Sequence, residues 1–383
     1  MKRIILLGST GSIGRQVLAV VKKYPDKFKV VGLSAHSNEA LLKDQISEFS
    51  PLYYHYNDGE RLHIQTSMFD LLDGTEAKYT ETLTELASAD CDLLICAVSG
   101  IAGLLPVLAA LSRGVNAAVA NKEAIVCGGA LMRAACQKSG AKLLPIDSEH
   151  SALWQCLRGE DAKTVKRLII TASGGALRNM TREEIAQVTA KDALNHPVWK
   201  MGKKVTIDSA TLFNKGLEVV EASRLFDIEA NRISVLMHPE SIVHGLVEFC
   251  DNSLKASLAV PDMALPIEHA MFYPERAEAS VKPLDLIRLG ALNFEKPDYH
   301  RFPCLEIVLD AAARQKNGAV VALSAADEIL VEEFIAGEIS FYDISHYLEK
   351  TLKKFSDACA DTVDEIFDID REARQYIFKQ GTK

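Results

Sequence analysis

Two acidic residues, Asp147 and Glu149, stand two positions apart directly after the apolar run 143–146. On an extended backbone both side chains point the same way, and they repel unless a cation or a shared proton lies between them. Oxygen ligands of this kind select hard divalent ions such as Mg²⁺ or Mn²⁺. The ordinary alternative is a solvated acidic turn, which explains most isolated pairs with this spacing.

A second group of polar residues lies within 208–218. On a helix, Asn214 and Lys215 lie one turn before Glu218 and share its face. Lys215 could hold a phosphate while Glu218 supplies a third metal oxygen, although a plain Lys–Glu surface pair has the same spacing. Upstream, Ser173 is followed by two glycines, so a hydroxyl and consecutive backbone N–H groups could face a phosphate. A simple tight turn fits those glycines equally well.

The segment 196–204 gathers a histidine, a proline, a glycine and several lysines around Trp199, one of two tryptophans in the chain. Such a loop could close over a ligand, with Trp199 excluding water and His196 reaching inward. Trp199 could equally well anchor the loop to the core.

A glycine-rich turn follows the first apolar run and opens a helical segment, which is the arrangement that places a pyrophosphate on a helix N-terminus. Its spacing is GxxGxxG, and an ordinary strand-to-helix turn is the alternative reading. We predict a dinucleotide site formed by Gly8, Ser9, Thr10, Gly11, Ser12, Ile13 and Gly14.

The end of the second predicted strand carries no acidic residue before Glu39, where an NAD enzyme usually has one against the ribose hydroxyls. Neutral donors and a histidine suit a 2′-phosphate better than a second anion would. This favours NADPH over NADH, bound near Ala35, His36, Ser37 and Asn38.

Short apolar runs alternate with helical segments over the first 147 residues, which predicts a doubly wound parallel sheet covered on both faces. The runs are 3–7, 29–33, 93–98, 116–120 and 143–146, and the helical segments are 13–23, 103–112 and 130–138. Ligands of such sheets bind outside the carboxyl ends of the strands. Four runs end there in polar turns, at 8–14, 99–100, 121–123 and 147–149. Lys122 could donate to a ligand oxygen or pair with a neighbouring carboxylate.

The alternation ends near Ser148. Predicted strands at 168–171, 233–237, 243–249 and 255–260 indicate an antiparallel sheet in an α+β domain, and helical periodicity returns at 304–314, 319–336 and 342–355. We therefore predict an α/β chain of four parts. These are a Rossmann-like NADPH-binding domain (1–147), a central α+β catalytic domain (148–281), a connection (282–303) and a small helical domain (304–383).

The overall composition of the chain limits the classes of partner that it can bind. The formal charge of the 383-residue chain is −9, which argues against nucleic acid as a partner. The eight cysteines show no CxxC spacing and lie mostly in apolar runs, which is typical of a reducing compartment. No run of about 20 apolar residues could span a bilayer, and the N-terminal apolar run is too short for a signal peptide. We expect a cytoplasmic protein with no membrane partner.

Taken together and in order, eight segments closely resemble the 1-deoxy-D-xylulose 5-phosphate reductoisomerase family of the non-mevalonate isoprenoid pathway. They are GSTGSIG (8–14), NKE (121–123), DSEH (147–150), TASGG (171–175), HPVWKMG (196–202), DSATLFNKGLE (208–218), HPESIVH (238–244) and PDMALPI (261–267). The segment 323–328 of the helical tail is also similar to the family's. Eight colinear motifs are far more specific than any one glycine loop.

The resemblance implies site roles residue by residue. The metal ligands would be Asp147, Glu149 and Glu218, for Mg²⁺ or Mn²⁺, with Co²⁺ as a further candidate. The phosphate would be held by Ser173, Ser209, Asn214 and Lys215. The flap would be His196 to Met201, with His150 and His244 as further active-site histidines and Met263 at the pocket border.

We also predict catalytic roles for Lys122, Glu149, His196, His150 and His244. Substrate contacts are predicted for Lys122, Ser148, Glu149, His196, Trp199 and Glu218, and further cofactor contacts for Ser99, Asn121, Glu123 and Gly202. The family often has a Gly-Lys or Gly-Gly step where this chain has Ala35-His36, so the recognition of the 2′-phosphate differs here in detail.

The resemblance implies that NADPH and the metal serve the isomerisation and reduction of 1-deoxy-D-xylulose 5-phosphate to 2-C-methyl-D-erythritol 4-phosphate, in a homodimer. Two other functions were weighed. A metal-independent NADP dehydrogenase of the semialdehyde or homoserine type would be insensitive to a chelator. A silent NADP-binding regulator would bind cofactor without turning over a sugar phosphate.

Overall fold

The computed structural model describes residues 1–57, 77–199, 201–278, 280–314 and 316–380, which form two compact units. The first unit contains 1–121, 132–147 and 263–280, and the second contains 122–131, 148–262 and 281–383. The four-part division at 147, 281 and 303 stays a prediction. No helix in the described ranges is long and apolar enough to cross a membrane.

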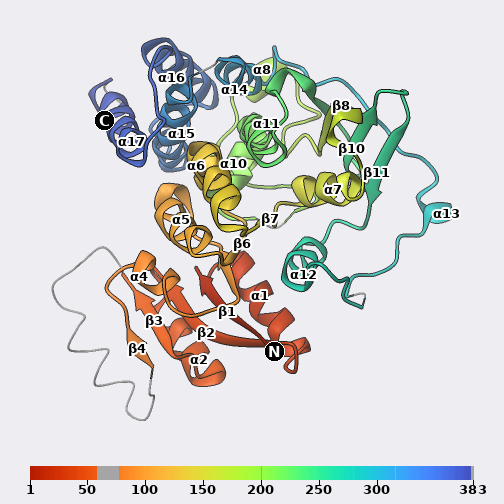
Figure 1. The fold of residues 1–383 in the computed structure, drawn as a ribbon. Helices are drawn as coiled ribbons and strands as arrows, with labels where there is room; N and C mark the ends of the chain where they lie inside the picture. The colour runs from red at the N-terminus through yellow and green to blue at the C-terminus, as the bar shows by residue number, and fades with distance from the viewer. Residues whose placement is uncertain (58–76, 200, 279, 315, 381–383) are drawn as a thin grey trace. The chain divides into compact units, whose positions relative to one another are not determined.

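The first unit is built on a seven-stranded parallel sheet of order β4-β3-β2-β1-β5-β6-β7 (Figure 1). Its strands are β1 (Lys2–Leu7), β2 (Phe28–Ala35), β3 (Tyr53–Tyr56), β4 (Lys78–Tyr79), β5 (Leu93–Cys96), β6 (Asn116–Val119) and β7 (Leu143–Pro145). Every residue of β5 is buried, as expected for a strand covered on both faces. The order reverses between β1 and β5, which confirms the doubly wound prediction and places a topological switch point beside the glycine turn.

Helices connect and cover these strands. They are α1 (Ser12–Lys23), α2 (Glu39–Phe49), α4 (Leu83–Ala87), η1 (Gly100–Gly103), α5 (Leu104–Ser112) and α12 (Ala264–Phe272). Although α12 is distant in sequence, it packs against α1, and its neighbour Tyr273 accepts a hydrogen bond from Lys142 Nζ (3.0 Å). The PDMALPI segment therefore joins the first unit through α12.

The second unit contains a four-stranded mixed sheet of order β11-β10-β8-β9. Its strands are β8 (Val165–Ala172), β9 (Ile233–Met237), β10 (Val243–Phe249) and β11 (Leu254–Leu258). The β10–β11 and β8–β10 pairs are antiparallel, as expected, but β8 pairs parallel with β9, so the prediction of a purely antiparallel sheet was wrong. Helix α7 (Ser148–Leu157) packs on β10 and β11. Helices α6 (Lys122–Ser139), α10 (Lys203–Thr211) and α11 (Phe213–Phe226) complete this layer.

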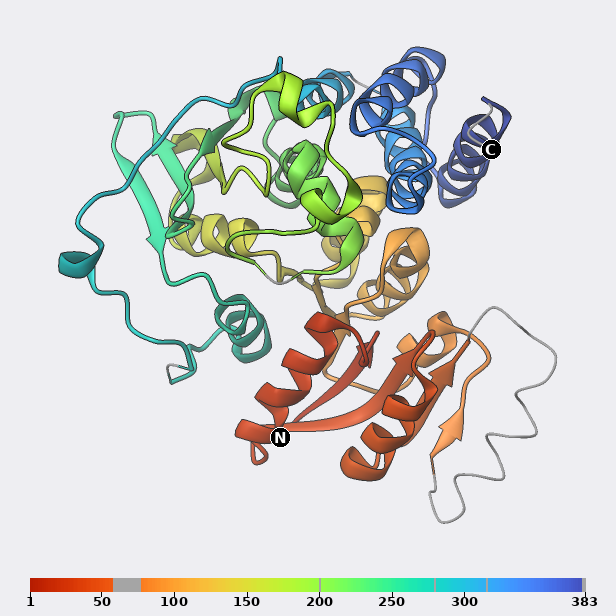
Figure 2. The same ribbon diagram turned by 180° about the vertical axis from the view of Figure 1, so that it is seen from behind.

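Helices α14 (Pro303–Ala313), α15 (Gly318–Ala336), α16 (Phe341–Lys354) and α17 (Val363–Lys379) follow (Figure 2). They share one hydrophobic core with the mixed sheet, in which Phe213 and Leu217 of α11 lie with Leu305 and Val308 of α14. A Cβ at Gly216 would lie 2.6 Å from Val308, so glycine lets α11 and α14 approach closely. Shorter elements are η2 (Ala162–Thr164), α8 (Arg182–Ile185), α9 (Ala190–Ala193), η3 (Ala230–Arg232) and α13 (Leu286–Leu289).

The structure corrects two local expectations. Helix α6 begins at Lys122, eight residues before the predicted start at 130, and α7 begins at Ser148. Lys122 and Glu149 therefore project from first helical turns, and the extended backbone assumed for the Asp147–Glu149 pair was wrong. The polar residues that looked like turn signals are here helix N-termini, where acidic side chains are favoured.

Candidate active site

The glycine turn after β1 is folded so tightly that side chains are excluded at its two ends. Gly8 has a φ of +82°, and a Cβ there would lie 2.4 Å from the carbonyl oxygen of Ala97 after β5. A Cβ at Gly14 would lie 2.2 Å from the carbonyl oxygen of Gly8. Gly11 is the N-cap of α1 and has no side-chain cap, so the first N–H groups of the helix are available to an anion.

Ser9 has a structural role within this turn. Its side chain is fully buried and donates to Gln45 Oε1 (2.6 Å), while its N–H donates to the carbonyl of Ser34 (2.8 Å). Ser34 Oγ also accepts from the N–H of Gly8 (3.0 Å). These bonds tie the glycine turn to the end of β2. A contribution of Ser9 to ligand binding would come from its backbone.

The other predicted cofactor residues of the first unit lie at the carboxyl ends of neighbouring strands. Asn121, after β6, is buried and donates from Nδ2 to the carbonyls of Val98 and Gly100 (both 2.7 Å), which fixes the loop that carries Ser99. At the end of β2, the ring of His36 bonds through Nδ1 to the carbonyl of Asn57.

The rest of that stretch is ordered by the start of α2. Asn38 caps the helix by accepting from the N–H of Leu41 (3.1 Å). Ala35 is buried at the end of β2, whereas Ser37 is exposed. Thr10, Ser12 and Ile13 lie in the turn and in the first residues of α1.

Three carboxylates converge near the start of α7. Asp147 directly precedes α7, Glu149 lies in the first turn of α7, and Glu218 lies on α11. One carboxylate oxygen from each lies within 4.8 Å of the others. Glu218 is almost fully buried, so its charge requires a counter-ion or a proton.

Two lysines supply positive charge to this set. Lys215 Nζ lies 2.8 Å from Glu149 Oε1 and 2.5 Å from Glu218 Oε2, and Lys122 Nζ lies 3.2 Å from Glu218 Oε1. Burial by itself would lower the pKa of Lys215, but Glu149 and Glu218 outweigh it and raise this pKa well above its usual range. Lys122 and Lys215 therefore offset part of the negative charge of this set, whose oxygen ligands suit a hard divalent cation.

Asn214 completes the polar face of α11. Its Oδ1 accepts from Lys122 Nζ (2.5 Å) and its Nδ2 donates to Glu218 Oε1 (2.5 Å). The predicted sharing of one helical face by Asn214, Lys215 and Glu218 is therefore confirmed. The surface-pair alternative fails because both Lys215 and Glu218 are buried.

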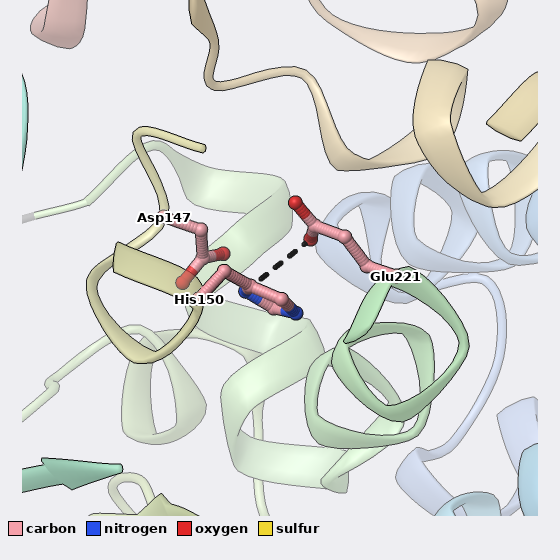
Figure 3. A group of neighbouring side chains, drawn as sticks. All are labelled: Asp147, His150 and Glu221. Atoms are coloured by element: carbon pink, nitrogen blue, oxygen red, sulfur yellow. Dashed lines mark ion pairs between the residues drawn. The ribbon is translucent and has the colours of Figure 1, made fainter. Parts of the chain in front are cut away.

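His150 extends this group toward Glu221, a residue that the sequence reasoning missed. A carbonyl oxygen can only accept, so His150 Nε2 donates to the backbone oxygen of Glu218 (2.9 Å). Its Nδ1 lies 3.7 Å from Glu221 Oε2. Figure 3 shows Asp147, His150 and Glu221 directed toward one another, and their ligand atoms also lie within 4.8 Å. The spacing of Glu218 and Glu221 by three residues could have identified the second carboxylate, since both lie on one side of the helix.

A separate group of polar residues surrounds Ser173, after β8. A Cβ at Gly175 (φ +64°) would lie 2.8 Å from the carbonyl oxygen of Ser209 and 2.9 Å from Ala210 Cα on α10. The Ser173–Gly175 turn and the residue Ser209 are therefore in contact through the backbone. Arg178 donates to the carbonyl oxygen of Ser173 (3.2 Å) and brings a positive charge to the turn.

His196 contacts Ser173, and its imidazole ring has a defined tautomer. Its Nδ1 accepts from the N–H groups of Val198 (3.1 Å) and Trp199 (2.8 Å), so the ring hydrogen is on Nε2. Nε2 therefore donates to Ser173 Oγ (3.1 Å), which leaves the hydroxyl hydrogen of Ser173 for another acceptor. Burial, and then the charge of Arg178, lower the pKa of His196 and favour this neutral form.

The predicted flap begins at His196. The indole of Trp199 lies 6.2 Å from the ring of His244, a buried residue of β10. Lys200 lies outside the described residues. Gly202 is the N-cap of α10, the helix that follows the flap.

The remaining predicted residues are placed as follows. Ser148 donates from Oγ to Glu149. Glu123 is buried, and its carboxylate lies 3.9 Å from Lys204 Nζ in the second unit. Met263 belongs to the first unit, as the N-cap of α12. The structure thus brings Asp147, Glu149 and Glu218 together and, separately, Ser173 with His196 and Ser209, while Glu123 faces a different buried charge.

Comparison with known proteins gives one consistent family. Residues 4–129 match the 1-deoxy-D-xylulose 5-phosphate reductoisomerase family model. Residues 143–226 match that enzyme's C-terminal domain, and residues 258–376 match a DXP reductoisomerase C-terminal domain. The chain is 44% identical over 387 residues to the 1-deoxy-D-xylulose 5-phosphate reductoisomerase of Thermoanaerobacter pseudethanolicus, covering 99% of both chains. It is also 44% identical to enzyme 1 of that name in Bacillus anthracis, covering 98% of this chain and 97% of that one.

Solved structures agree with these matches. A DOX-P reductoisomerase in complex with NADPH, fosmidomycin and magnesium superposes with a TM-score of 0.92 at 36% identity, covering 99% of this chain and 98% of that one. The enzyme from Zymomonas mobilis in complex with NADPH gives a TM-score of 0.91 at 36% identity, covering 100% of both chains.

Proposed function

This chain belongs to the 1-deoxy-D-xylulose 5-phosphate reductoisomerase family, and from that premise we propose that it converts this pentulose phosphate to 2-C-methyl-D-erythritol 4-phosphate. The reaction rearranges the carbon skeleton to a branched aldehyde and then reduces it. The enzyme is an NADPH- and divalent-metal-dependent oxidoreductase of the non-mevalonate isoprenoid pathway. The observation that carries the proposal is the convergence of three carboxylates on one another beside two buried lysines.

The metal ligands are Asp147, Glu149 and Glu218. Their oxygen atoms fit Mg²⁺ or Mn²⁺, and Co²⁺ is a further candidate. The alternative group of Asp147, His150 and Glu221 contains an imidazole, which suits softer ions, and it shares Asp147 with the first. When bound, the metal ion supplies Lewis-acid polarisation of the ketose oxygens, and NADPH supplies the hydride.

Lys122 and Lys215 place positive charge beside the carboxylates, where it can stabilise negative charge on the substrate. Lys122 reaches Asn214 and Glu218 from α6, and its ammonium stabilises the oxyanion that develops as the carbonyl reacts. Ser148 donates to Glu149 and so helps to fix the orientation of that carboxylate. His150 fixes the backbone at Glu218 through its Nε2–H.

The substrate phosphate is held by Ser173, Ser209, Asn214 and Lys215. Ser173 suits this role because its oxygen accepts from His196 and its hydroxyl hydrogen can then point to an anion. Anchoring a phosphate remote from the reacting carbons positions the substrate and lowers the entropic part of the barrier.

The flap, His196 to Met201, closes over the substrate. His196 links the flap to Ser173, and Trp199 lies near His244 in the same unit. Loop closure of this kind excludes water and completes the site. His244 and Met263 border the substrate.

NADPH binds at the carboxyl edge of the parallel sheet, through the glycine turn 8–14 and the segments at Ala35–Asn38, Ser99, Asn121, Glu123 and Gly202. The uncapped N-terminus of α1 is suited to the pyrophosphate. The functional domains are those predicted from the sequence, at 1–147, 148–281, 282–303 and 304–383.

We place the enzyme in the cytoplasm as a homodimer. The eight cysteines are free thiols, as expected of a reducing compartment. Strand β11 is an edge of its sheet and exposes Leu254 and Leu258, and Ile287 of α13 is 95% exposed. Exposed apolar side chains at a sheet edge favour association with a second copy.

The test follows NADPH oxidation with the pentulose phosphate and Mn²⁺, with and without a chelator. Replacing Glu149 by Gln removes a metal ligand without changing its size, and we expect activity to fall by at least about 100-fold. The matched control is Glu160→Gln, the same change at an exposed residue paired with Lys255, which should leave the rate unaltered. Activity of Glu149→Gln within a few-fold of the parent, or a parent indifferent to chelator, contradicts the metal assignment.

A further inference from the structure

A second buried charge cluster lies in the second unit, away from the proposed metal ligands. Lys204 of α10 places its Nζ 2.6 Å from Asp208 Oδ2 and 2.7 Å from Asp327 Oδ2. Glu123 of α6 lies 3.9 Å away. Asp208 and Asp327 are only 1% and 0% exposed. The cluster therefore joins α10 to α15, which pack against each other.

The charges of this cluster do not balance if every acid is ionised. One ammonium then faces three carboxylates in the interior, leaving two negative charges uncompensated, and burying such charges is costly. The neighbouring Glu328 is already paired with Arg374 of α17 at 2.6 Å. Cys304 of α14 adds no charge, because burial, and then Asp327 and Asp208, raise the pKa of its thiol far above the usual range.

The carboxyl oxygens that do not contact Lys204 indicate that one of the two acids carries a proton. In the described part of the chain, neither Asp208 Oδ1 nor Asp327 Oδ1 has a hydrogen-bond partner, although both are buried. The two carboxyl groups meet at one ammonium, since Asp208 Oδ2 and Asp327 Oδ2 lie 2.6 Å and 2.7 Å from Lys204 Nζ. Two carboxylates cannot form a hydrogen bond to each other, since both only accept, whereas a carboxylic acid and a carboxylate can.

Electrostatics agree with this geometry. Burial raises the pKa of Asp327 well above its usual value, and proximity to Asp208 raises it further. Burial also raises the pKa of Asp208, against the opposing effect of Lys204. Burial would lower the pKa of Lys204, but Asp208 and Asp327 outweigh it, so the lysine stays charged.

We propose that Asp208 and Asp327 share one proton beside Lys204. We also propose that this carboxyl pair positions Ser209 for the substrate, because it holds α10 against α15. Ser209 follows Asp208 directly on α10, and Gly175 of the phosphate turn rests on the backbone of Ser209. A displacement of α10 from α15 would therefore move both sides of the phosphate pocket. The positioning part rests on the proposed function, whereas the shared proton does not.

The shared proton predicts an unusual pattern of stability in the full-length protein. In either Asp208→Asn or Asp327→Asn, the amide replaces the protonated carboxyl, donates to the remaining carboxylate and accepts from Lys204. At pH 7.5 each single variant should therefore be at least as stable as the parent, because the parent must take up a proton on folding and the variant need not. The double variant leaves Lys204 with only the distant Glu123, and its midpoint should fall by about 5 °C or more.

Ordinary salt bridges give the opposite pattern, in which each single substitution destabilises and the double variant shows roughly the sum. That result overturns the shared proton. The matched control is Glu328→Gln, which removes a partly buried carboxylate that lies on the same helix and has its own cation, and which should be destabilising as a single change.

The pH dependence provides an independent measurement. Unfolded aspartates ionise near pH 4, so the folded pair holds one more proton than the unfolded chain between that pH and the raised pKa of the pair. Within this window the unfolding equilibrium constant of the parent should rise about tenfold per pH unit relative to Asp327→Asn, which has no proton to lose. Parallel pH profiles of the two proteins contradict the proposal.

Kinetics test the positioning role. In the double variant, KM for the pentulose phosphate should rise at least about tenfold, while KM for NADPH stays near the parent value. In the single variants, both KM values should stay near those of the parent. An unchanged substrate KM in a folded double variant refutes the positioning role. If the parent itself turns over no pentulose phosphate, the proposed function fails, and the stability series still decides the shared proton.

Discussion

Removing the ammonium of Lys215 should strongly destabilise the second unit, because that group neutralises the buried carboxylate of Glu218 and the partly buried carboxylate of Glu149. Lys215→Met keeps most of the side-chain length but deletes contacts of 2.8 Å to Glu149 and 2.5 Å to Glu218. Hydrogen bonds to charged groups contribute about 1.5–3 kcal/mol each, so two of them correspond to about 3–6 kcal/mol. Breaking a buried ion pair by removing one partner costs about 3–5 kcal/mol, which agrees.

The sign of the pH dependence follows from the raised pKa of Lys215. A lysine whose pKa is raised on folding contributes stability that is fully present below its unfolded value, near 10.4, and is lost as the pH rises through the folded value. Between pH 6 and 9 the ammonium is charged in both states, so its full contribution is present. The loss in Lys215→Met should therefore not depend on titration of this lysine within that range.

Thermal unfolding measured with chelator and with Mn²⁺ tests the reasoning. With chelator, we expect the midpoint of Lys215→Met to lie about 10 °C below that of the parent. Mn²⁺ should restore part of this loss, because a divalent cation that binds the folded carboxylates stabilises the native state by mass action. The increase on adding Mn²⁺ should be larger in the variant than in the parent.

A control variant shows whether the destabilisation is specific to Lys215 or follows the removal of an exposed lysine as well. Lys43 pairs with Glu39 across one helical turn in the first unit, and both side chains are partly exposed. Lys43→Met should cost under about 1 kcal/mol, since exposed pairs contribute little, and Mn²⁺ should not restore it. A Lys215→Met protein as stable as Lys43→Met, or unresponsive to Mn²⁺, would refute the account of the carboxylate set.

Two further predictions concern the phosphate pocket and the flap. Gly175→Ala should raise KM for the pentulose phosphate at least about tenfold, because its Cβ would press 2.8 Å from the carbonyl of Ser209 at a positive φ. Gly159→Ala is the matched control, with a similar positive φ and nothing within 4 Å, and an equal effect there would contradict the contact. The lowered pKa of His196 means that its stabilising contribution is present above the unfolded value of about 6.5 and is lost as the pH falls below it. Imidazole NMR should show His196 still neutral at pH 6.5 with hydrogen on Nε2, and Trp199 fluorescence should report flap loosening at lower pH. A His196 resonance that titrates above pH 6.5 excludes this.

Local pattern was sufficient where neighbours in the sequence are also neighbours in space. The runs 233–237 and 243–249 coincide with β9 and β10, because short segments rich in Val, Ile, Leu and Phe and bounded by polar residues favour strands. The face shared by Asn214, Lys215 and Glu218 also followed from helical periodicity and was found in the structure.

Helix starts were harder to predict. The sequence reasoning placed the Asp147–Glu149 pair on an extended backbone, but α7 begins at Ser148. The residue types that favour turns also favour helix N-termini, so the same letters are consistent with both. The two carboxylates still lie together, for a different reason than the one proposed.

The cluster around Lys204 shows where sequence pattern stops being sufficient. Lys204 and Asp327 are 123 positions apart, so no periodicity connects them. One sign was visible, since Asp327 stands in the middle of a helix whose other residues are mostly apolar. An acid in such a helix must be neutralised by a proton or by a cation from another element. Sequence can therefore identify the residue whose charge requires compensation, but only the packing of α10 on α15 identifies the compensating group. In this cluster that packing brings a second acid as well as a lysine, which is why a proton is required in addition to the cation.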